Sequence, residues 1–386
     1  MNRVKYFRPD IFKLDDLNIN PPVIAPAQLV QAYFPVDRTG KFNPFNMMYD
    51  PIPTVGKFNK TLEECCMDAA QNLWKLGKPV ELFWSGGIDS SGALIALLET
   101  KSDSDILNIR YTEESIVEFP LMWEKMVKGR NDPLPDKVML DETLFNNHDI
   151  IKVTGECGDQ CFGSDALRDN IDKHADDWKS IFTWGSFGGG TSIPNSKLIT
   201  GNAAHDMPRK NPKTYKLRME QLAEVITEQV DSAPIEIKTI FDLFWWCNFC
   251  FKWQDVDSRL IFTFTTNTEW KSTLSFFNTE DFQRWSIVNH DIKHGGSWET
   301  YKQPAKEYIN KYIKDENYRK NKTKEPSLIK ILQGAIDEKY NFAYRQKRRG
   351  RPDRIKLVLE DGQFWRRNEK VPDEIYEEIL IGGYHG

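Results

Sequence analysis

The clearest periodic pattern in the chain lies between residues 61 and 77. Thr61-Leu-Glu-Glu64 has the form of a capping box, and apolar residues then recur every three or four positions until Gly77. This spacing predicts an amphipathic helix. An apolar strand at 79–84, a glycine-containing turn at 85–90 and a helical segment through 93–98 follow in order.

The alternation of strands and helices continues along the chain. Residues 106–109 predict a strand, 119–127 a helix, and 150–153 a strand that enters a second glycine-rich loop. This order favours an α/β fold, in which a parallel sheet of Rossmann-like type carries helices on both faces. From about residue 216 to 260 the pattern is helical and aromatic, and a loop and more helices follow to about residue 318, which predicts a mostly helical second half.

The two ends of the chain differ from this central part. Residues 1–60 are rich in Pro and Asn without a sustained period, so we expect an irregular N-terminal arm. Residues 61–330 would form the main domain, and 331–386 a small basic extension. Within that extension, apolar runs on either side of Asp361-Gly362 predict a β-hairpin.

Composition narrows the class of protein. The 386 residues are 40% hydrophobic and carry a net charge of −5, which gives no global attraction to nucleic acid or to an anionic membrane. The N-terminus lacks a signal-peptide pattern and no apolar run is long enough to span a bilayer, so we expect a soluble cytoplasmic protein. Cys247 and Cys250 lie in an aromatic run, which favours buried core thiols over zinc ligands.

The first candidate for chemistry is the turn Ser85-Gly-Gly-Ile-Asp-Ser90. It joins a strand to a helix N-terminus, where backbone N–H groups and the helix dipole favour a phosphate. Ser85, Gly86, Gly87 and Ser90 are therefore the expected contacts to phosphate oxygens, and the family resemblance described below implies that these belong to ATP or pyrophosphate. Asp89 would be repelled by a bare phosphate, so it makes most sense as a Mg²⁺ ligand. The alternative is an ordinary turn in which Asp89 caps the helix.

The second candidate is the loop from Thr154 to Gly163. Because it follows another strand, it should reach the same carboxyl edge of the sheet, where open α/β sheets bind ligands. It brings Glu156 and Asp159 together, and two acids beside a phosphate loop require a compensating cation or a role as a base. The alternative is a solvated loop with glycine turns.

Together the two loops resemble the synthetase domain of asparagine synthetase and its relative β-lactam synthetase. That family has Ser-Gly-Gly-x-Asp-Ser first and Ser-Gly-Glu-Gly-Ser-Asp-Glu-x-Phe-Gly-Gly-Tyr second. The matching residues in the second loop are Gly155, Glu156, Asp159, Phe162 and Gly163, with Thr154 close to the family's Ser, whereas Cys157, Gly158, Gln160 and Ser164 depart from it.

The resemblance implies an adenine nucleotide α-hydrolase-like fold and roles for these residues. Asp89 and Asp159 would hold Mg²⁺ on the pyrophosphate. Glu156 would be catalytic, serving the nitrogen nucleophile or the tetrahedral intermediate. Gln160 removes a negative charge from the family pattern, which points to a different substrate.

Two lysine-bearing segments extend the resemblance. Lys302-Gln-Pro-Ala-Lys306 and Lys322-Thr-Lys-Glu325 are similar to segments near the end of the family's domain. By this resemblance Lys302 binds the phosphates and Lys324 is catalytic, stabilising the transition state. Lys306, Lys320 and Lys322 are close competitors, and any single lysine here could be a solvated surface charge.

The implied activity is that of an ATP-dependent, AMP-forming ligase that makes an amide. ATP would adenylate a small-molecule carboxylate with release of pyrophosphate, and ammonia or an amine would then attack. Asn2 stands where glutamine-hydrolysing relatives have a cysteine, so we expect that the chain does not hydrolyse glutamine by itself and that free ammonia, an amine or a separate glutaminase supplies the nitrogen.

Two other functions remain open. An RNA- or nucleobase-modifying enzyme of the same ATP-splitting superfamily would suit the basic run at 345–351, although the second loop argues against it and against a nucleic-acid partner. A non-catalytic binding module is the other.

Overall fold

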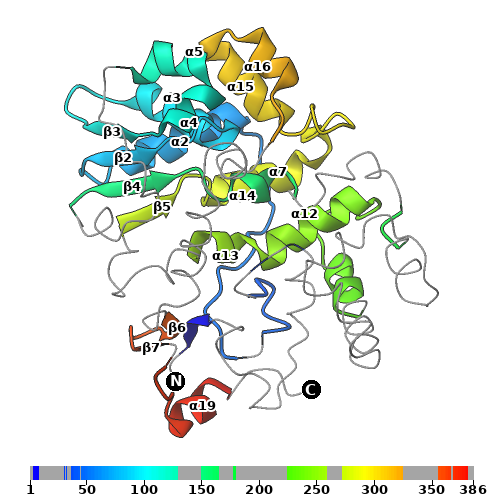
Figure 1. Ribbon diagram of the computed structural model, residues 1–386. Coiled ribbons are helices and arrows are strands. Elements are labelled where there is room, and N and C mark those ends of the chain that lie inside the picture. Colours follow the sequence, from blue (N-terminus) through cyan, green and yellow to red (C-terminus); the bar gives the residue numbers. More distant parts are fainter. Residues whose placement is uncertain are drawn as a thin grey trace, which may run out of the picture. The chain divides into compact units, whose positions relative to one another are not determined.

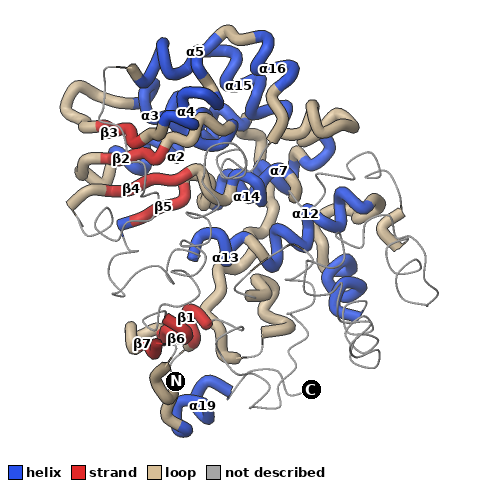
Figure 2. Tube along the Cα trace, viewed as in Figure 1, coloured by secondary structure: helices blue, strands red, loops and turns tan. Residues whose placement is uncertain are grey.

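The computed structural model describes residues 3–7, 30, 32, 36–43, 45–128, 149–164, 177–179, 224–258, 272–324, 355–366 and 368–380 (Figures 1 and 2). Two compact units are present. Unit 1 comprises Met1–Val55, Phe162–Arg259 and Ile355–Gly386, and unit 2 comprises Gly56–Cys161 and Leu260–Arg354. The expected boundaries at residues 60 and 330 divide the chain differently, because residues 162–259 group with the two ends.

Unit 2 contains a four-stranded parallel sheet in the order β3-β2-β4-β5. Its strands are β2 (Val80–Phe83), β3 (Leu107–Arg110), β4 (Ile151–Thr154) and β5 (Thr273–Ser275). The first three were predicted from apolar runs. The short strand β5 was not predicted, because its sequence Thr-Leu-Ser carries a single apolar residue. The α/β class with a parallel sheet is thus confirmed.

The two faces of this sheet differ in chemistry. In a parallel sheet paired residues share a face, so the registers place seven aliphatic side chains together: Val80, Leu82, Leu107, Ile109, Ile151, Val153 and Leu274. The opposite face carries Glu81, Phe83, Asn108, Arg110, Lys152, Thr154, Thr273 and Ser275. On it, Arg110 Nε lies 2.5 Å from Glu81 Oε1 on the neighbouring strand.

Several helices of unit 2 pack against one another beside the sheet (Figure 1). They are α2 (Leu62–Trp74), α3 (Ile88–Thr100) and α15 (Gln303–Ile313), with α16 (Glu316–Asn321) against α15. The predicted capping box of α2 is present, because Thr61 and Glu64 exchange side-chain and backbone hydrogen bonds. Helix α3 buries most of its residues, which fixes the loop at its N-terminus.

The region after β3 differs from the prediction in detail. Helix α4 (Glu113–Glu118) was not expected, and the helix expected at 119–127 is present as α5 (Pro120–Met122) followed by a π-helical turn, η2 (Trp123–Val127). Pro120 at the first position of α5 explains the break from α4. Two further helices of unit 2 are α14 (Glu280–Val288) and η7 (His290–Ile292).

Unit 1 contains a three-stranded antiparallel sheet. The predicted C-terminal hairpin is confirmed as β6 (Ile355–Leu359) and β7 (Phe364–Arg366), and β6 also pairs with β1 (Val4–Phe7). The expectation of an irregular N-terminal arm was wrong for these four residues. The reason is that β1 becomes a strand only through pairing with a segment at the far end of the chain.

The helices of unit 1 include α12 (Ile240–Phe251), α13 (Trp253–Ser258) and α19 (Asp373–Leu380). Helix α12 buries all of its residues except Asp242, as expected of a helix that is aromatic on all sides. Cys247 and Cys250 on this helix are fully buried thiols, in agreement with the prediction of core residues.

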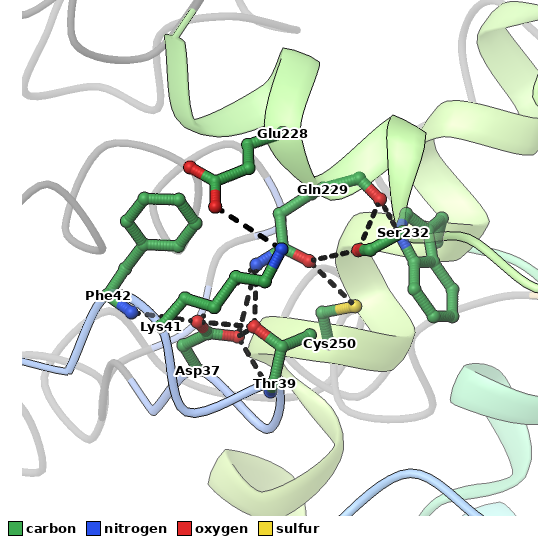
Figure 3. A network of polar contacts seen from close by, with 9 residues as sticks. Asp37, Thr39, Lys41, Phe42, Glu228, Gln229, Ser232 and Cys250 are labelled. Carbon is green, nitrogen blue, oxygen red and sulfur yellow. Dashed lines mark hydrogen bonds and ion pairs between the residues drawn. The ribbon is translucent and has the colours of Figure 1, made fainter. Parts of the chain in front are cut away.

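Unit 1 also holds a buried carboxylate, Asp37, within a polar network (Figure 3). Its oxygens accept hydrogen bonds from the backbone N–H and hydroxyl of Thr39 at 2.9 Å and 2.7 Å, and from the N–H of Phe42 at 3.0 Å. Gln229 Nε2 donates to it at 3.3 Å. Burial raises the pKa of the Asp37 carboxyl, and the hydrogen bonds from Thr39 and Phe42 only partly offset that rise.

Within the described part of the chain, every helix is too short or too polar to cross a membrane.

Candidate active site

The turn at 85–90 has the predicted position between β2 and α3. Gly87 is the N-cap of α3, and no side chain caps this helix, so Asp89 is not the helix cap of the alternative interpretation. Gly86 adopts φ 76°, and a Cβ at that position would stand 2.5 Å from the carbonyl oxygen of Ser115. Glycine is therefore required there by both conformation and space.

The two serine hydroxyls shape this turn from within. Ser85 Oγ and Ser90 Oγ lie 3.0 Å apart, and Ser90 Oγ accepts the backbone N–H of Ser85 at 3.1 Å. Ser85 Oγ also accepts the N–H of Gly87 at 3.3 Å. The hydroxyls expected to meet a phosphate thus also form hydrogen bonds within the turn itself.

The second loop lies directly against the first. It runs from β4 into α7 (Gly158–Phe162), and Cys157 adopts a left-handed φ of 65°. A Cβ at Gly155 would stand 2.9 Å from the backbone nitrogen of Ser90, and one at Gly158 would stand 2.5 Å from Asp89 Cγ. Gly158 departs from the family pattern, yet the contact with Asp89 leaves no room for a side chain.

Strand order explains why these two loops meet. From β2 the chain moves to β3 on one side, and β4 then lies on the other side of β2. The loops after β2 and β4 therefore leave the sheet where the strand order reverses, which is the position at which open α/β sheets bind ligands.

Two acids and two lysines meet at this position. Lys302 Nζ lies 2.7 Å and 2.5 Å from the two carboxylate oxygens of Asp89, and 2.6 Å from Asp159 Oδ1. Lys324 Nζ lies 2.8 Å from Asp159 Oδ2. The Lys302 side chain is 0% exposed, whereas Asp89, Asp159 and Lys324 keep 15%, 21% and 19% exposure. Four residues selected from the sequence thus form one ion-paired cluster.

The backbone aims Lys302 into this cluster. Lys302 precedes α15 and adopts a left-handed conformation, φ 60° and ψ 28°. Its N–H donates to the carbonyl of Lys293 at 3.0 Å. A non-glycine residue in this conformation is uncommon and costs free energy, so the turn is held by its surroundings.

The segment that carries Lys324 is held by two side chains. Trp298 Nε1 donates to the carbonyl of Lys324 at 3.0 Å, and Lys306 Nζ donates to the carbonyl of Lys322 at 3.2 Å and to that of Glu299. Lys306 is fully buried, and burial lowers the pKa of its ammonium to about 8. The competitor Lys306 therefore supports the backbone around the cluster and is no surface charge.

The two acids of the cluster titrate differently. Burial disfavours the charged form of Asp159, but Lys302 and Lys324 outweigh it and hold the pKa of that carboxyl well below its usual range. Burial raises the pKa of Asp89; Lys302 partly offsets this rise and the negative charge of Asp159 adds to it. Asp159 is thus the more firmly ionised of the two.

A second ion pair lies beside the turn at 85–90. Lys322 Nζ contacts Glu118 Oε1, and the two side chains are only 12% and 13% exposed. Lys320, by contrast, is exposed. The alternative of a solvated surface charge, open for every lysine of this segment, therefore does not apply to Lys322. Glu118 was missed from the sequence because an acid at the end of a short helix gives no signal of its own.

Three further candidates from the sequence remain: Glu156, Gln160 and the basic run at 345–351. Glu156 is half buried in the second loop, where its backbone N–H donates to Thr154 Oγ1 at 3.4 Å. Gln160 is 2% exposed. The basic run at 345–351 lies outside the described residues.

The donor chemistry of the cluster fits Mg²⁺. Carboxylate oxygens are its preferred protein ligands, and Asp89 and Asp159 lie close to each other because Lys302 Nζ contacts both. Among the residues described, no group of three or more His, Cys, Asp or Glu could hold a metal ion. Two protein carboxylates completed by phosphate oxygens would be the usual arrangement for magnesium with a nucleotide.

Comparison with known proteins gives no family for this chain. No protein-family model matches the sequence, and no curated protein matches it.

Proposed function

We propose that the protein is an ATP-dependent, AMP-forming ligase that adenylates a carboxylate and then forms an amide, in the manner of asparagine synthetase. The observation that carries the proposal is the cluster of Asp89, Asp159, Lys302 and Lys324. It lies where loops from two adjacent parallel strands meet. The same position supports the proposal of a Rossmann-like, adenine nucleotide α-hydrolase-like fold with helices on both faces of the sheet.

The turn at 85–90 would bind the phosphates of ATP. The N-terminus of α3 presents backbone N–H groups without a side-chain cap, and Gly86 and Gly87 allow close approach. Ser85 and Ser90 are placed to exchange their mutual contact for contacts with phosphate oxygens. This chemistry suits a pyrophosphate leaving group.

The two lysines would take separate roles. Lys302, fully buried, is an immobile cation that would face the leaving pyrophosphate. Lys324 is partly exposed and would stabilise the charge that develops when the nucleophile attacks the acyl-adenylate. Each lysine is oriented by Asp159 before substrate arrives, so less reorganisation is needed during the reaction.

Asp89 and Asp159 would hold Mg²⁺ together with phosphate oxygens of the nucleotide. The ion would supply positive charge that neutralises the triphosphate and the released pyrophosphate. Glu156, on the loop next to Asp159, would serve the incoming nitrogen, which we take to be ammonia or an amine. The carboxylate substrate and the nitrogen donor would be small molecules.

Carboxylate-dependent exchange of pyrophosphate into ATP tests the proposal. The purified chain would be incubated with ATP, Mg²⁺ and labelled pyrophosphate in the presence of amino acids and other carboxylates in turn. We expect at least one carboxylate to stimulate the exchange and AMP to accumulate once ammonia is added. Hydrolysis to ADP and phosphate, or exchange independent of every carboxylate, would contradict the proposal.

A further inference from the structure

We propose that Lys322 is a positioning residue that neutralises Glu118, and that this ion pair sets how tightly the turn at 85–90 binds a phosphate-type anion. The inference rests on the proposed function in one respect, since it takes that turn as the phosphate site. It assigns roles to two residues that the proposed reaction does not use.

Glu118 lies directly against the turn. A Cβ placed on Gly86 would stand 2.7 Å from Glu118 Cβ and 3.1 Å from its Cγ. The carboxylate of Glu118 therefore belongs to the immediate surroundings of the turn. A negative charge at this position repels phosphate, so a site for a polyanion requires that it be compensated.

Lys322 supplies the compensating charge. Its ammonium contacts Glu118 Oε1, and both side chains are largely buried at 12% and 13% exposure. A pair with this burial is screened by water much less than a surface pair. Removal of one partner would leave the other charge uncompensated beside the turn.

The surroundings hold both partners in place. The rings of Phe119, next to Glu118, and Tyr318 stack with centroids 3.7 Å apart and planes 9° from parallel. The N–H of Lys322 donates to the carbonyl of Tyr318 at 3.0 Å. The aromatic stack thus links the segment of each charged residue to the other, and the pair is no chance contact of two flexible side chains.

The helix that carries Glu118 is also tied to the strand that carries the turn. Ser115 Oγ donates to the carbonyl of Trp84 at 2.9 Å, and the N–H of Phe119 donates to the carbonyl of Ser115 at 3.2 Å. Glu118 is therefore held at a fixed distance from Gly86. Its charge affects the turn in every state in which these hydrogen bonds persist.

A double-mutant cycle measures this effect. Binding of inorganic pyrophosphate at fixed Mg²⁺ would be measured by calorimetry at pH 8 for the parent, Lys322→Met, Glu118→Gln and the double variant. Lys320→Met, which removes an exposed lysine two positions before Lys322, is the matched control.

The two single variants are expected to change the affinity for pyrophosphate in opposite directions. Lys322→Met should weaken binding by about tenfold or more, and Glu118→Gln should strengthen it by roughly threefold, because Lys322 is then released to attract the anion. The double variant should return to within about threefold of the parent, since neither charge remains. Lys320→Met should bind like the parent.

Several outcomes would overturn the inference. Unchanged binding by Lys322→Met, or a double variant as weak as Lys322→Met alone, would mean that Lys322 either has no influence or contacts the anion directly. If Lys322→Met fails to fold, as judged by thermal unfolding, Glu118→Gln decides by itself, because weaker or equal binding by that variant contradicts the proposal.

Failure of the proposed function is a separate result. If the parent binds pyrophosphate and the variants change its binding as expected, but carboxylate-dependent exchange is absent, the proposed function is contradicted and the inference is supported. If the exchange is present but the variants do not change binding as expected, the proposed function is supported and the inference is contradicted. A parent that binds no pyrophosphate at all would overturn both.

Discussion

Unit 1 and unit 2 each hold carboxylates that are largely shielded from water, and the partners of these carboxylates differ. Asp37 in unit 1 is 0% exposed and is surrounded by neutral donors from Thr39, Phe42 and Gln229 (Figure 3). Asp89 and Asp159 in unit 2 face the ammonium groups of Lys302 and Lys324. Asp37 therefore stabilises a part of the fold, whereas Asp89 and Asp159 belong to a cluster of opposite charges.

Most donors of Asp37 are local, although Gln229 comes from 192 positions away. Two of them lie within five residues of it along the chain, so the carboxylate mainly fixes the turn at 37–43. The cations of the unit 2 cluster come from far along the chain, Lys302 being 213 positions from Asp89. Positive charges that are brought together from distant segments can also interact with a bound anion. We therefore propose a function for the unit 2 cluster and not for the network around Asp37.

The largest expected effect is on the acids of the cluster. Asp89→Asn or Asp159→Asn should reduce carboxylate-dependent exchange by about a thousandfold or more, because each removes a charge that would hold Mg²⁺, a contribution of several kcal/mol. Exchange of labelled pyrophosphate into ATP measures this. Circular dichroism should show the parental fold, and near-parental exchange in either variant would exclude the metal assignment.

The next effect concerns Lys324. Lys324→Ala should slow turnover by about a hundredfold, roughly 3 kcal/mol, with ATP binding little changed, because the ammonium acts mainly on charge that develops during attack. Rates at saturating ATP and calorimetric binding of ATP separate the two effects.

Lys320→Ala is the matched control for Lys324, since it removes the same charge from an exposed position. It should cost almost nothing. Should Lys320→Ala be the slow variant while Lys324→Ala turns over normally, the alignment of this segment with the family is out of register.

For unit 1 the comparison predicts a loss of stability in place of a loss of activity. Asp37→Ala leaves the donors of Thr39, Phe42 and Gln229 without their acceptor and should lower the free energy of unfolding by about 3 kcal/mol. Urea denaturation measures this loss. Exchange activity per folded molecule should stay at the parental level, and a specific loss of activity at full stability would refute the distinction between the two clusters.

The smallest effect is on the pH dependence of stability. The pKa of Asp37 is raised in the folded state, so the folded protein takes up a proton before the unfolded chain does, and this residue adds stability as the pH falls through that raised value. Asp37→Asn removes the contribution. The variant should therefore lose stability more steeply on acidification toward about pH 4 than the parent, as followed by urea midpoints; a shallower loss would contradict the sign.

Local patterns predicted much of the fold. The capping box at Thr61 and the apolar runs of β2, β3 and β4 depend on neighbouring residues, and each appears as predicted. Strand β1 escaped prediction because its pairing partner β6 lies at the opposite end of the chain.

The candidate site divides in the same way. Asp89 and Asp159 could be selected from short motifs, and the resemblance supplied Lys302 and Lys324. The pairing of Glu118 with Lys322 could not be predicted, because the two residues are 204 positions apart and Glu118 belongs to no motif. Only packing, here the stack of Phe119 on Tyr318, brings such residues together.

The chemical contrast between the two faces of the parallel sheet also bears on how the strands find their partners. If β4 paired with β2 one residue out of register, the side chain of Lys152 would point to the aliphatic face of the sheet, beside residues such as Val80 and Leu82. An ammonium forced into that layer without a partner would carry a large desolvation penalty. Misaligned pairings are therefore much higher in free energy than the native one. The face of the sheet that carries Lys152 thus favours the correct register of the two strands from which both loops extend.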